Sequence, residues 1–153
     1  MTSVRFSIDT NVLVYLFAAT EPDKALRARE LLRASLLADC VLTLQCLGEF
    51  LHAVTRKGLI PPSVATGHIE RWLTAFPAVA ADVGCVRAAL RILASHHLSY
   101  WDALLLATLR EARCSVLLSE DMQHGGDYDG VRVLNPVLGD RLSDEIEALL
   151  AVD

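Results

Sequence analysis

Two hydrophobic periods alternate along the chain, and each change of period marks a new element. Apolar and polar residues alternate over residues 4–8, and this period of two predicts a strand with one face on a core. Residues 12–17 predict a helix that begins at once, with Thr10 or Asn11 as its N-cap. The pattern then predicts strands over 40–44, 79–83, 116–118 and 131–134, and helices over 24–35, 47–57, 61–76, 85–96, 103–109 and from 143 onward.

Strands that alternate with helices favour a parallel sheet covered by helices on both faces. The helix over 103–109 is apolar nearly all round, which predicts that it is buried. Residues 125–130 predict a turn-rich loop, and Gly58 predicts the end of the third helix. No repeat or linker interrupts the 153 residues, so we expect an α/β fold in a single domain over 1–153.

The composition adds an expectation about partners and location. Apolar residues make up 53% of the chain and the mean hydropathy is +0.37. Both values favour a fully covered sheet and some apolar surface reserved for a partner. The four cysteines have no C-x-x-C spacing and lie in apolar stretches, so we expect reduced core residues and a cytoplasmic protein. No apolar run is long enough to span a bilayer.

The charge distribution is more informative than the net charge of −5, which by itself gives no hint of nucleic-acid binding. The chain has twelve arginines and two lysines. Arginine suits bidentate contacts with phosphate, although an arginine bias is also common in high-GC coding sequences. If four acids were neutralised in one metal site, the rest of the chain would carry a net charge near −1. Parts of the remaining surface would then be basic.

Four acids stand where elements begin or end. Asp9 and Asp121 follow predicted strands, Asp102 begins the buried helix, and Glu49 lies on the third helix among apolar residues. Each has a plainer interpretation: Asp9 or Asp102 as a helix cap, and Glu49 as a residue facing water. Parallel strands bring their carboxyl ends to one edge of the sheet, where ligands bind. Together the four acids therefore predict one cluster.

Packed carboxylates repel one another, and a divalent cation removes that repulsion. Oxygen ligands without His or Cys favour Mg²⁺ or Mn²⁺, and the chemistry of such sites is phosphodiester hydrolysis. Asn11, Ser119 and Glu120 are supporting candidates: Ser119 as a hydrogen-bond partner of a carboxylate or as a turn residue, and Glu120 as an extra ligand or as a side chain pointing away. His124 is the one histidine near Asp121.

Several segments, in this order, resemble the motifs of PIN-domain ribonucleases. They are Ile8–Leu13, Leu47–Phe50 with Glu49, Tyr100–Leu104 with Asp102, Leu118–Gly125 with Asp121, and Leu134–Pro136. The length is similar to that of VapC-type toxins of bacterial toxin–antitoxin pairs. The resemblance implies a three-layer α/β/α fold and a metal-dependent endoribonuclease with Asp9, Glu49, Asp102 and Asp121 as its site. It also implies a small cognate antitoxin and a homodimer.

One position departs from the family. Many relatives carry a further acid two residues after the fourth one, where this chain has Gln123, and either Glu120, Asp127 or no residue substitutes for it. Two other functions stay open: a catalytically inactive RNA-binding or scaffold protein of this fold, and a metal-dependent phosphatase or DNA nuclease. The target RNA, the cleavage site, the number of metal ions and the identity of the antitoxin are not encoded in any motif.

The resemblance and the composition lead to two hypotheses about what the protein binds. An antitoxin would lay an apolar helix or strand across residues 13–37 and 50–54 and extend an Arg or Lys into the acidic pocket. The substrate would be single-stranded or loop RNA, because a narrow carboxylate-lined cleft needs a splayed backbone. Arg56 and Arg110 lie about two turns from Glu49 and Asp102 on their helices, which makes them candidates for phosphate contacts.

Overall fold

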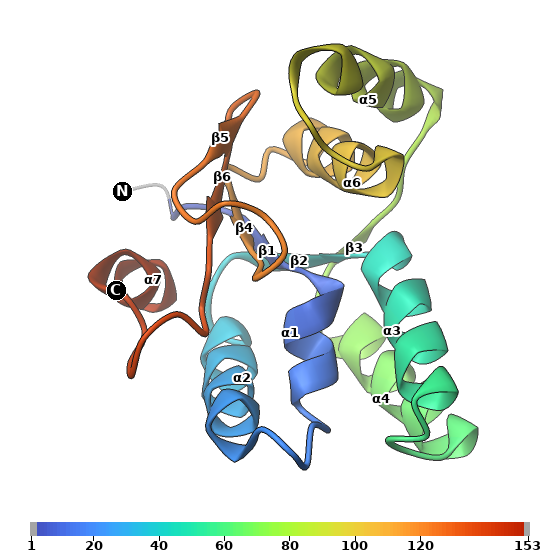
Figure 1. Ribbon diagram of the computed structural model, residues 1–153, viewed down its shortest axis with the longest axis vertical. Coiled ribbons are helices and arrows are strands. Elements are labelled where there is room, and N and C mark those ends of the chain that lie inside the picture. Colours follow the sequence, from blue (N-terminus) through green and yellow to red (C-terminus); the bar gives the residue numbers. More distant parts are fainter. Residues whose placement is uncertain (1–2, 152–153) are drawn as a thin grey trace.

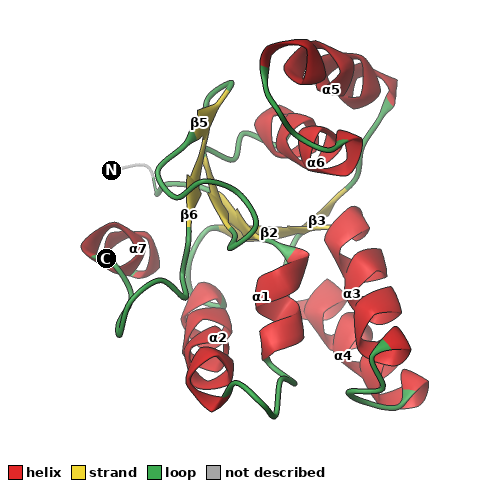
Figure 2. Ribbon diagram, viewed as in Figure 1, coloured by secondary structure: helices red, strands yellow, loops and turns green. Residues whose placement is uncertain are grey.

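A six-stranded sheet lies between two layers of helices in the computed structural model, which describes residues 3–151 (Figure 1, Figure 2). The strands are β1 (Phe6–Ile8), β2 (Cys40–Thr43), β3 (Ala78–Val79), β4 (Val116–Leu118), β5 (Asp127–Tyr128) and β6 (Val131–Leu134). The helices are α1 (Thr10–Tyr15), α2 (Pro22–Ser35), α3 (Leu44–Arg56), α4 (Pro62–Ala75), α5 (Val83–Ser95), α6 (Tyr100–Glu111) and α7 (Asp144–Leu150). The predicted three-layer α/β/α architecture is confirmed.

The strand order β3-β2-β1-β4-β6-β5 creates a topological switch point beside β1. The chain passes from β1 to β2 on one side and later returns to β4 on the other, and all these pairs are parallel. Ile8 lies opposite Leu118, and the backbone N–H of Asp9 donates to the carbonyl of Leu118 at 2.9 Å. The ends of β1 and β4 are therefore level, and ligands of such sheets bind at this crevice.

The strands β1, β2 and β4 are buried on both faces, as the interior of a parallel sheet requires. Phe6 and Ile8 pack into a core with α1, α2, α3, α4 and α7, whereas Leu117 packs on the other face with α5 and α6. In Figure 2 these two helix layers lie on opposite sides of the strands. The period of two in the sequence thus becomes two separate cores, one on each side of the sheet.

Helix α3 shows how local sequence sets the bounds of an element. The Thr43 hydroxyl accepts a hydrogen bond from the Cys46 N–H at 3.1 Å, so the helix begins at Leu44. The sequence prediction had counted Leu44 with the strand, and that assignment is wrong. At the other end Gly58, with φ of 65°, takes the left-handed conformation that ends many helices. The predicted role of Gly58 is confirmed.

Residues 125–130 contain a strand where the sequence predicted only a loop. Asp129 and Gly130 both have positive φ, 58° and 92°, and form a tight turn between β5 and β6. An Asp-Gly pair favours this kind of hairpin turn, and β5 pairs antiparallel with β6 as a result. The sheet is therefore mostly parallel with one antiparallel edge. The first strand is also shorter than predicted, since it begins at Phe6.

Two helix caps differ from the prediction. Asp9 is the N-cap of α1, because its carboxylate accepts the Thr10 N–H at 2.7 Å; Thr10 and Asn11 already belong to the helix. Ser99 caps α6, and its hydroxyl accepts the N–H of Asp102 at 3.1 Å. The interpretation of Asp102 as a cap is wrong, because the helix begins two residues earlier than the acid. No helix within residues 3–151 is long and apolar enough to cross a membrane.

Candidate active site

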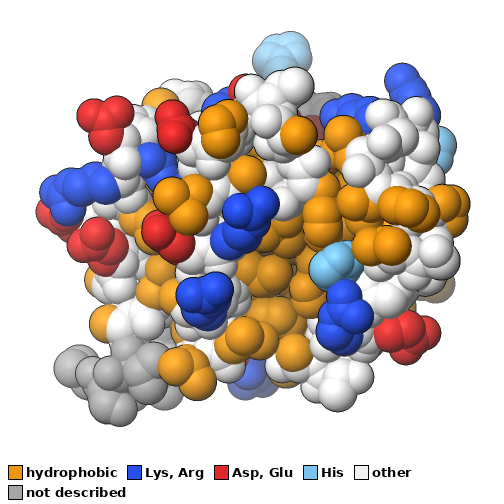
Figure 3. Space-filling view, turned by 90° about the horizontal axis from the view of Figure 1, so that it is seen from below, with side chains coloured by type: hydrophobic (Ala, Val, Ile, Leu, Met, Phe, Trp, Pro, Cys, Tyr) orange, Lys and Arg blue, Asp and Glu red, His pale blue; other side chains and the backbone are white. Residues whose placement is uncertain are grey.

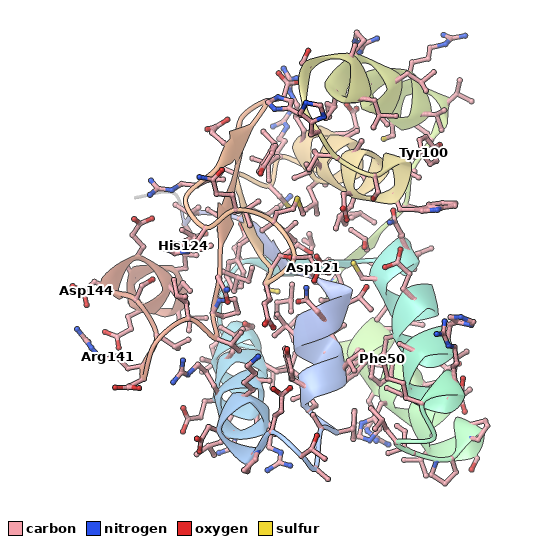
Figure 4. All side chains as sticks on the ribbon, in the orientation of Figure 1. Phe50, Tyr100, Asp121, His124, Arg141 and Asp144 are labelled. Carbon is pink, nitrogen blue, oxygen red and sulfur yellow. The ribbon has the colours of Figure 1, made fainter. Side chains whose placement is uncertain are left out.

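A cavity of about 760 Å³ opens at the carboxyl ends of β1 and β4. Its lining brings together side chains from α1, α3, α6 and the loop after β4, including all four acids singled out in the sequence: Asp9, Glu49, Asp102 and Asp121. Figure 4 labels Asp121 where the loop after β4 reaches the beginning of α1. Asn11 and Glu120 also line the cavity. The predicted convergence of the acids is present.

Asp9 is the most buried of the four carboxylates, with 4% of its surface exposed. It accepts hydrogen bonds from the Thr10 N–H and the Ser119 hydroxyl, both at 2.7 Å, and contacts the Cys46 sulfur at 3.7 Å. Burial raises the pKa of Asp9 to about 6, and the nearby charges of Asp121 and Asp102 act in the same direction. The two hydrogen bonds only partly offset this effect.

Ser119 joins the two strand ends through one buried hydroxyl. Besides donating to Asp9, its oxygen accepts the backbone N–H of Asp121 at 3.1 Å and lies 3.4 Å from the side-chain nitrogen of Asn11. Asn11 in turn accepts the N–H of Glu120 at 3.5 Å. These contacts make Ser119 both a turn residue and the partner of a carboxylate, so the two interpretations from the sequence hold at once.

Glu49 faces the cavity instead of open water. Its two carboxylate oxygens accept hydrogen bonds from the Thr10 hydroxyl and the Gln45 side-chain amide, each at 2.9 Å. The same Gln45 nitrogen donates to the backbone carbonyl of Trp101 at 3.0 Å, which ties the beginning of α3 to the beginning of α6. The interpretation of Glu49 as a solvent-facing residue is wrong, because α3 packs beside α1 along this face.

Asp102 and Asp121 complete the cluster from the more open side. Asp102 is partly buried, and this burial raises its pKa, with further contributions from the charges of Asp121 and Glu49. Asp121 is exposed. Since Asp9 and Asp102 each respond to the charge of Asp121, the acids form one electrostatic unit with uncompensated negative charge.

Glu120 is held by a cation from α2. The Lys24 ammonium lies 3.1 Å from a Glu120 oxygen and 3.1 Å from the Tyr15 hydroxyl, and these two hydrogen bonds raise the pKa of Lys24. The strand alternation that would turn Glu120 away does not apply, because β4 ends at Leu118. Glu120 therefore lines the cavity with its charge already balanced.

The other polar candidates lie outside the cavity. His124 accepts the backbone N–H of Asn135 at 3.0 Å and so holds the closing segment, and Asp127 accepts the N–H of Gly130 in the hairpin turn. Arg110 forms an ion pair with Asp129. Neither Arg56 nor Gln123 is among the cavity-lining residues. Of the substitutes considered for the missing fifth acid, Glu120 alone reaches the cavity.

The carboxylates offer the oxygen donors that Mg²⁺ and Mn²⁺ prefer. Among residues 3–151, no three His, Cys, Asp or Glu side chains stand close enough together to hold one ion as they are arranged here. Burial raises the pKa of Asp9 and Asp102, and the charges of the neighbouring acids add to this effect, so the site favours bound protons or a cation. A divalent cation fits this donor set, with side-chain rotation bringing the carboxylates onto it.

Sequence reasoning missed the neighbours that orient the acids. Thr10, Gln45 and Cys46 contact Glu49 or Asp9, and Lys24 holds Glu120. One signal was present, since Gln45 precedes Glu49 by one helical turn, a spacing at which side chains meet. No comparable signal links Lys24 to Glu120, because 96 residues separate them.

The comparisons with known proteins agree with this geometry. The family model described as the PIN domain matches residues 7–124, a span that contains all four acids. Among curated proteins, none matches this chain at the required significance.

Solved structures share the fold at low sequence identity. FitAcB from Neisseria gonorrhoeae is 19% identical, with a TM-score of 0.65 over 86% of this chain and 97% of that one. VapC20 from Mycobacterium tuberculosis, described as a toxin that cleaves the sarcin-ricin loop, is 19% identical, with a TM-score of 0.62 over 76% and 91%. DNA-bound VapBC from Salmonella typhimurium is 14% identical, with a TM-score of 0.61 over 85% and 96%. Because the family model spans most of the chain and the fold agrees, the chain belongs to the PIN-domain family.

Proposed function

We propose that the chain is a Mg²⁺- or Mn²⁺-dependent endoribonuclease and the toxin of a toxin–antitoxin pair. The observation that carries the proposal is the convergence of Asp9, Glu49, Asp102 and Asp121 on one cavity at the switch point of the sheet. No nucleophilic side chain is needed for metal-assisted phosphodiester hydrolysis, and within residues 3–151 the cavity lining contains no Ser, Cys or His.

The position of each acid suggests its role in binding a cation. Asp9, Asp102 and Asp121 would hold a divalent cation, while Glu49 lies on the far side of α1's first turn, closer to a second ion or its waters. A bound cation would supply a Lewis acid and an activated water. Ser119 fixes one oxygen of Asp9, and Thr10 with Gln45 fixes both oxygens of Glu49, so these acids stay oriented without the cation.

The substrate is proposed to be single-stranded or loop RNA, because a backbone that is splayed out of a helix can bring one phosphodiester down to a group of carboxylates that lines a cavity. The test incubates the purified protein with transfer RNA, a fully paired RNA duplex, single-stranded DNA and a phosphomonoester, each with Mg²⁺, Mn²⁺ or excess chelator. Cation-dependent cutting confined to RNA loops supports the proposal. Equal cutting of duplex RNA or DNA would favour a general nuclease, and binding without cutting would favour an inactive RNA-binding protein.

An apolar groove supports the proposed antitoxin. It is formed by α2, α4 and the end of α1, and its apolar residues are Leu16, Phe17, Leu32, Leu36, Trp72, Ala75 and Phe76. Arg29, Arg33, His68 and Arg71 lie among them. Figure 3 shows hydrophobic side chains gathered on this end of the molecule, with basic side chains around them. An amphipathic segment with acidic edges would fit such a surface.

The position of this groove refines the earlier hypothesis about the partner. The groove uses residues 16–36 as expected, but its opposite wall is α4 and not the segment 50–54, where Phe50 and Val54 are fully buried. One structure of similar fold, from Klebsiella pneumoniae, is described as a toxin–antitoxin complex. Co-expression with the adjacent reading frame should give a stable complex that does not cleave RNA. A well-behaved, non-toxic monomer without any partner would count against the toxin.

We also infer a homodimer from exposed apolar side chains at the adjoining beginnings of α3 and α6. Leu44 is 49% exposed and Trp101 is 61% exposed, and the Gln45–Trp101 hydrogen bond holds the two helix ends together. Light scattering of the purified protein, with Trp101→Arg as the disrupting variant, tests this inference. An unchanged mass for that variant would place the interface elsewhere.

A further inference from the structure

The four candidate acids and Lys57 line the same cavity, together with Glu21, which lies 3.5 Å from Lys24. On α3 the cavity's lining residues are Glu49, Ala53 and Lys57, which follow one another at four-residue spacing and so share one helix face. Eight residues of helix rise by about 12 Å. Asp9 is the N-cap of α1, next to the sheet, and Lys57 is the C-cap of α3. Figure 1 shows that α3 runs away from the sheet toward this end.

Lys57 is the cation of this cavity that a ligand can reach. The chain has only two lysines. Lys24 is engaged by Glu120 at 3.1 Å and by Glu21 at 3.5 Å. Lys57 is exposed and takes part in no ion pair within residues 3–151, and no arginine of that range lines the cavity.

The stretch between the acids and Lys57 is small and apolar. Val14 and Ala18 line it from α1 and the turn that follows, Ala53 from α3, and Leu59 from the segment after α3. The helices α1 and α3 pack against each other, and these side chains line the cavity where the two helices meet. Their apolar surface suits sugars or bases more than phosphates. The cation of the acidic site would then bind one phosphate group, and the ammonium group of Lys57 would bind another.

We propose that Lys57 binds a phosphate of the RNA that flanks the scissile phosphodiester, with the strand lying between α1 and α3. This inference rests on the proposed ribonuclease function. The role is one of binding and specificity: Lys57 would set how many nucleotides beyond the cleavage point a good substrate must have. A substrate too short on that side would not reach it.

The experiment compares Lys57→Ala and Lys57→Arg with Arg56→Ala. Arg56 is the matched control, because it is an equally exposed cation on the preceding residue but does not line the cavity. Binding of a short fluorescein-labelled single-stranded RNA is measured in an Asp9→Asn background, which keeps the RNA intact. We expect Lys57→Ala to weaken binding by roughly tenfold and to lower the salt dependence by about 0.7 of a log unit per log unit of salt.

Lys57→Arg should bind RNA nearly as well as the parent, since it keeps the charge, and Arg56→Ala should change binding less than about twofold. In the active background, Lys57→Ala should raise KM with little change in kcat, and only for RNAs extended on one side of the cut, 5′ or 3′. Thermal unfolding of each variant confirms that the fold is intact.

Equal effects of Lys57→Ala and Arg56→Ala, or no effect of either, would overturn the inference while cleavage by the wild-type protein still upholds the ribonuclease. Failure of the wild-type protein to cut any RNA would overturn the function itself. A loss of antitoxin affinity with RNA binding unchanged would reassign Lys57 to a peptide carboxylate and reject the phosphate contact.

Discussion

Helix α1 separates two hollows of opposite chemistry. On one side, Asn11, Val14 and Tyr15 line the acidic cavity; on the other, Leu16 and Phe17 line the apolar groove. The cavity gathers carboxylates, and burial, helped by the charges of the neighbouring acids, raises the pKa of Asp9 and Asp102. The groove gathers exposed apolar surface with arginines beside it.

The difference shows two kinds of free-energy cost in one small fold. The cavity destabilises the free protein through desolvated like charges, a cost that protons or a divalent cation relieve. The groove leaves apolar surface in water, a cost that a partner relieves and that pH hardly changes. Variants in the cavity should therefore change the response to metal and pH, and variants in the groove should change the response to a partner.

The largest effect is expected from Asp9→Asn. The substitution removes a cation ligand but little volume, so RNA cleavage should fall by about 100-fold or more while the protein stays folded. Glu111→Gln, an exposed acid on α6 away from the cavity, is the control and should keep full activity. Cleavage of labelled RNA in Mg²⁺ or Mn²⁺ is the measurement. Full activity of Asp9→Asn, or activity of the wild type in excess chelator, would refute the metal site.

On the groove side, Leu36→Glu should weaken antitoxin binding by roughly 100-fold, because it adds a charge that repels an acidic partner and removes apolar contact. Leu26→Glu is the matched control on α2, the helix whose C-cap is Leu36, since Leu26 is 54% exposed, Leu36 is 50% exposed, and Leu26 lies outside the groove. Titration calorimetry with the product of the adjacent reading frame measures the affinity. RNA cleavage by either variant should match the wild type; a joint loss of cleavage and binding would mean that the two hollows are not separate.

The next largest effect is a pH dependence of the free energy of unfolding, which we expect from the cavity and not from the groove. The pKa of Asp9 is about 6 in the native state against an ordinary value of 3.8, so the native state binds this proton more tightly than the unfolded chain. The stabilising contribution is complete below about pH 3 and is lost as the pH rises through 6, by about 3 kcal/mol in total, most of it between pH 4 and pH 7. The Asp9→Asn variant has no titrating group at this position and should lack the loss.

Urea unfolding in chelator should therefore show Asp9→Asn gaining about 2 kcal/mol on the wild type between pH 4 and pH 7. Added Mg²⁺ should shrink that gain, because a bound cation stabilises the carboxylate form. Leu36→Glu offers the contrast. The difference in its free energy of unfolding from the wild type should show no change between pH 4 and pH 6, the range in which Asp9 titrates in the unfolded and the native state. A difference between Asp9→Asn and wild type that is flat with pH would contradict the cavity's electrostatic cost.

The smallest effect is expected from Ser119→Ala, which removes a hydrogen bond to Asp9 but leaves all four carboxylates in place. Activity should fall by roughly tenfold, and the pKa of Asp9 should rise further because that bond favours the charged form. The pH profile of cleavage measures the second effect. Ser115→Ala, at an exposed position before β4, should leave the profile unchanged. A lowered rate with an unshifted profile would limit Ser119 to a purely structural role.

The order of the elements and the edge of the sheet that carries the acids were both predictable. The period of two in Val4 to Ile8 and the apolar residues 116–118 located β1 and β4, and parallel strands necessarily end at one edge. Asp9 and Asp121 followed from that alone. The hairpin between β5 and β6 was also encoded, in Asp129 and Gly130, but its Asp-Gly signal was not recognised among other turn residues.

The sequence by itself thus determined the type, the order and the approximate position of most elements, and which acids reach the carboxyl edge of the sheet, because these depend on local periods. The tertiary structure decided which way Glu49 faces, which cation neutralises Glu120, and that Lys57 lies along the cavity while Arg56 beside it does not. Those outcomes depend on how α1, α2 and α3 pack against one another. A contact such as Lys24 to Glu120 joins residues 96 positions apart, and no local pattern carries that distance.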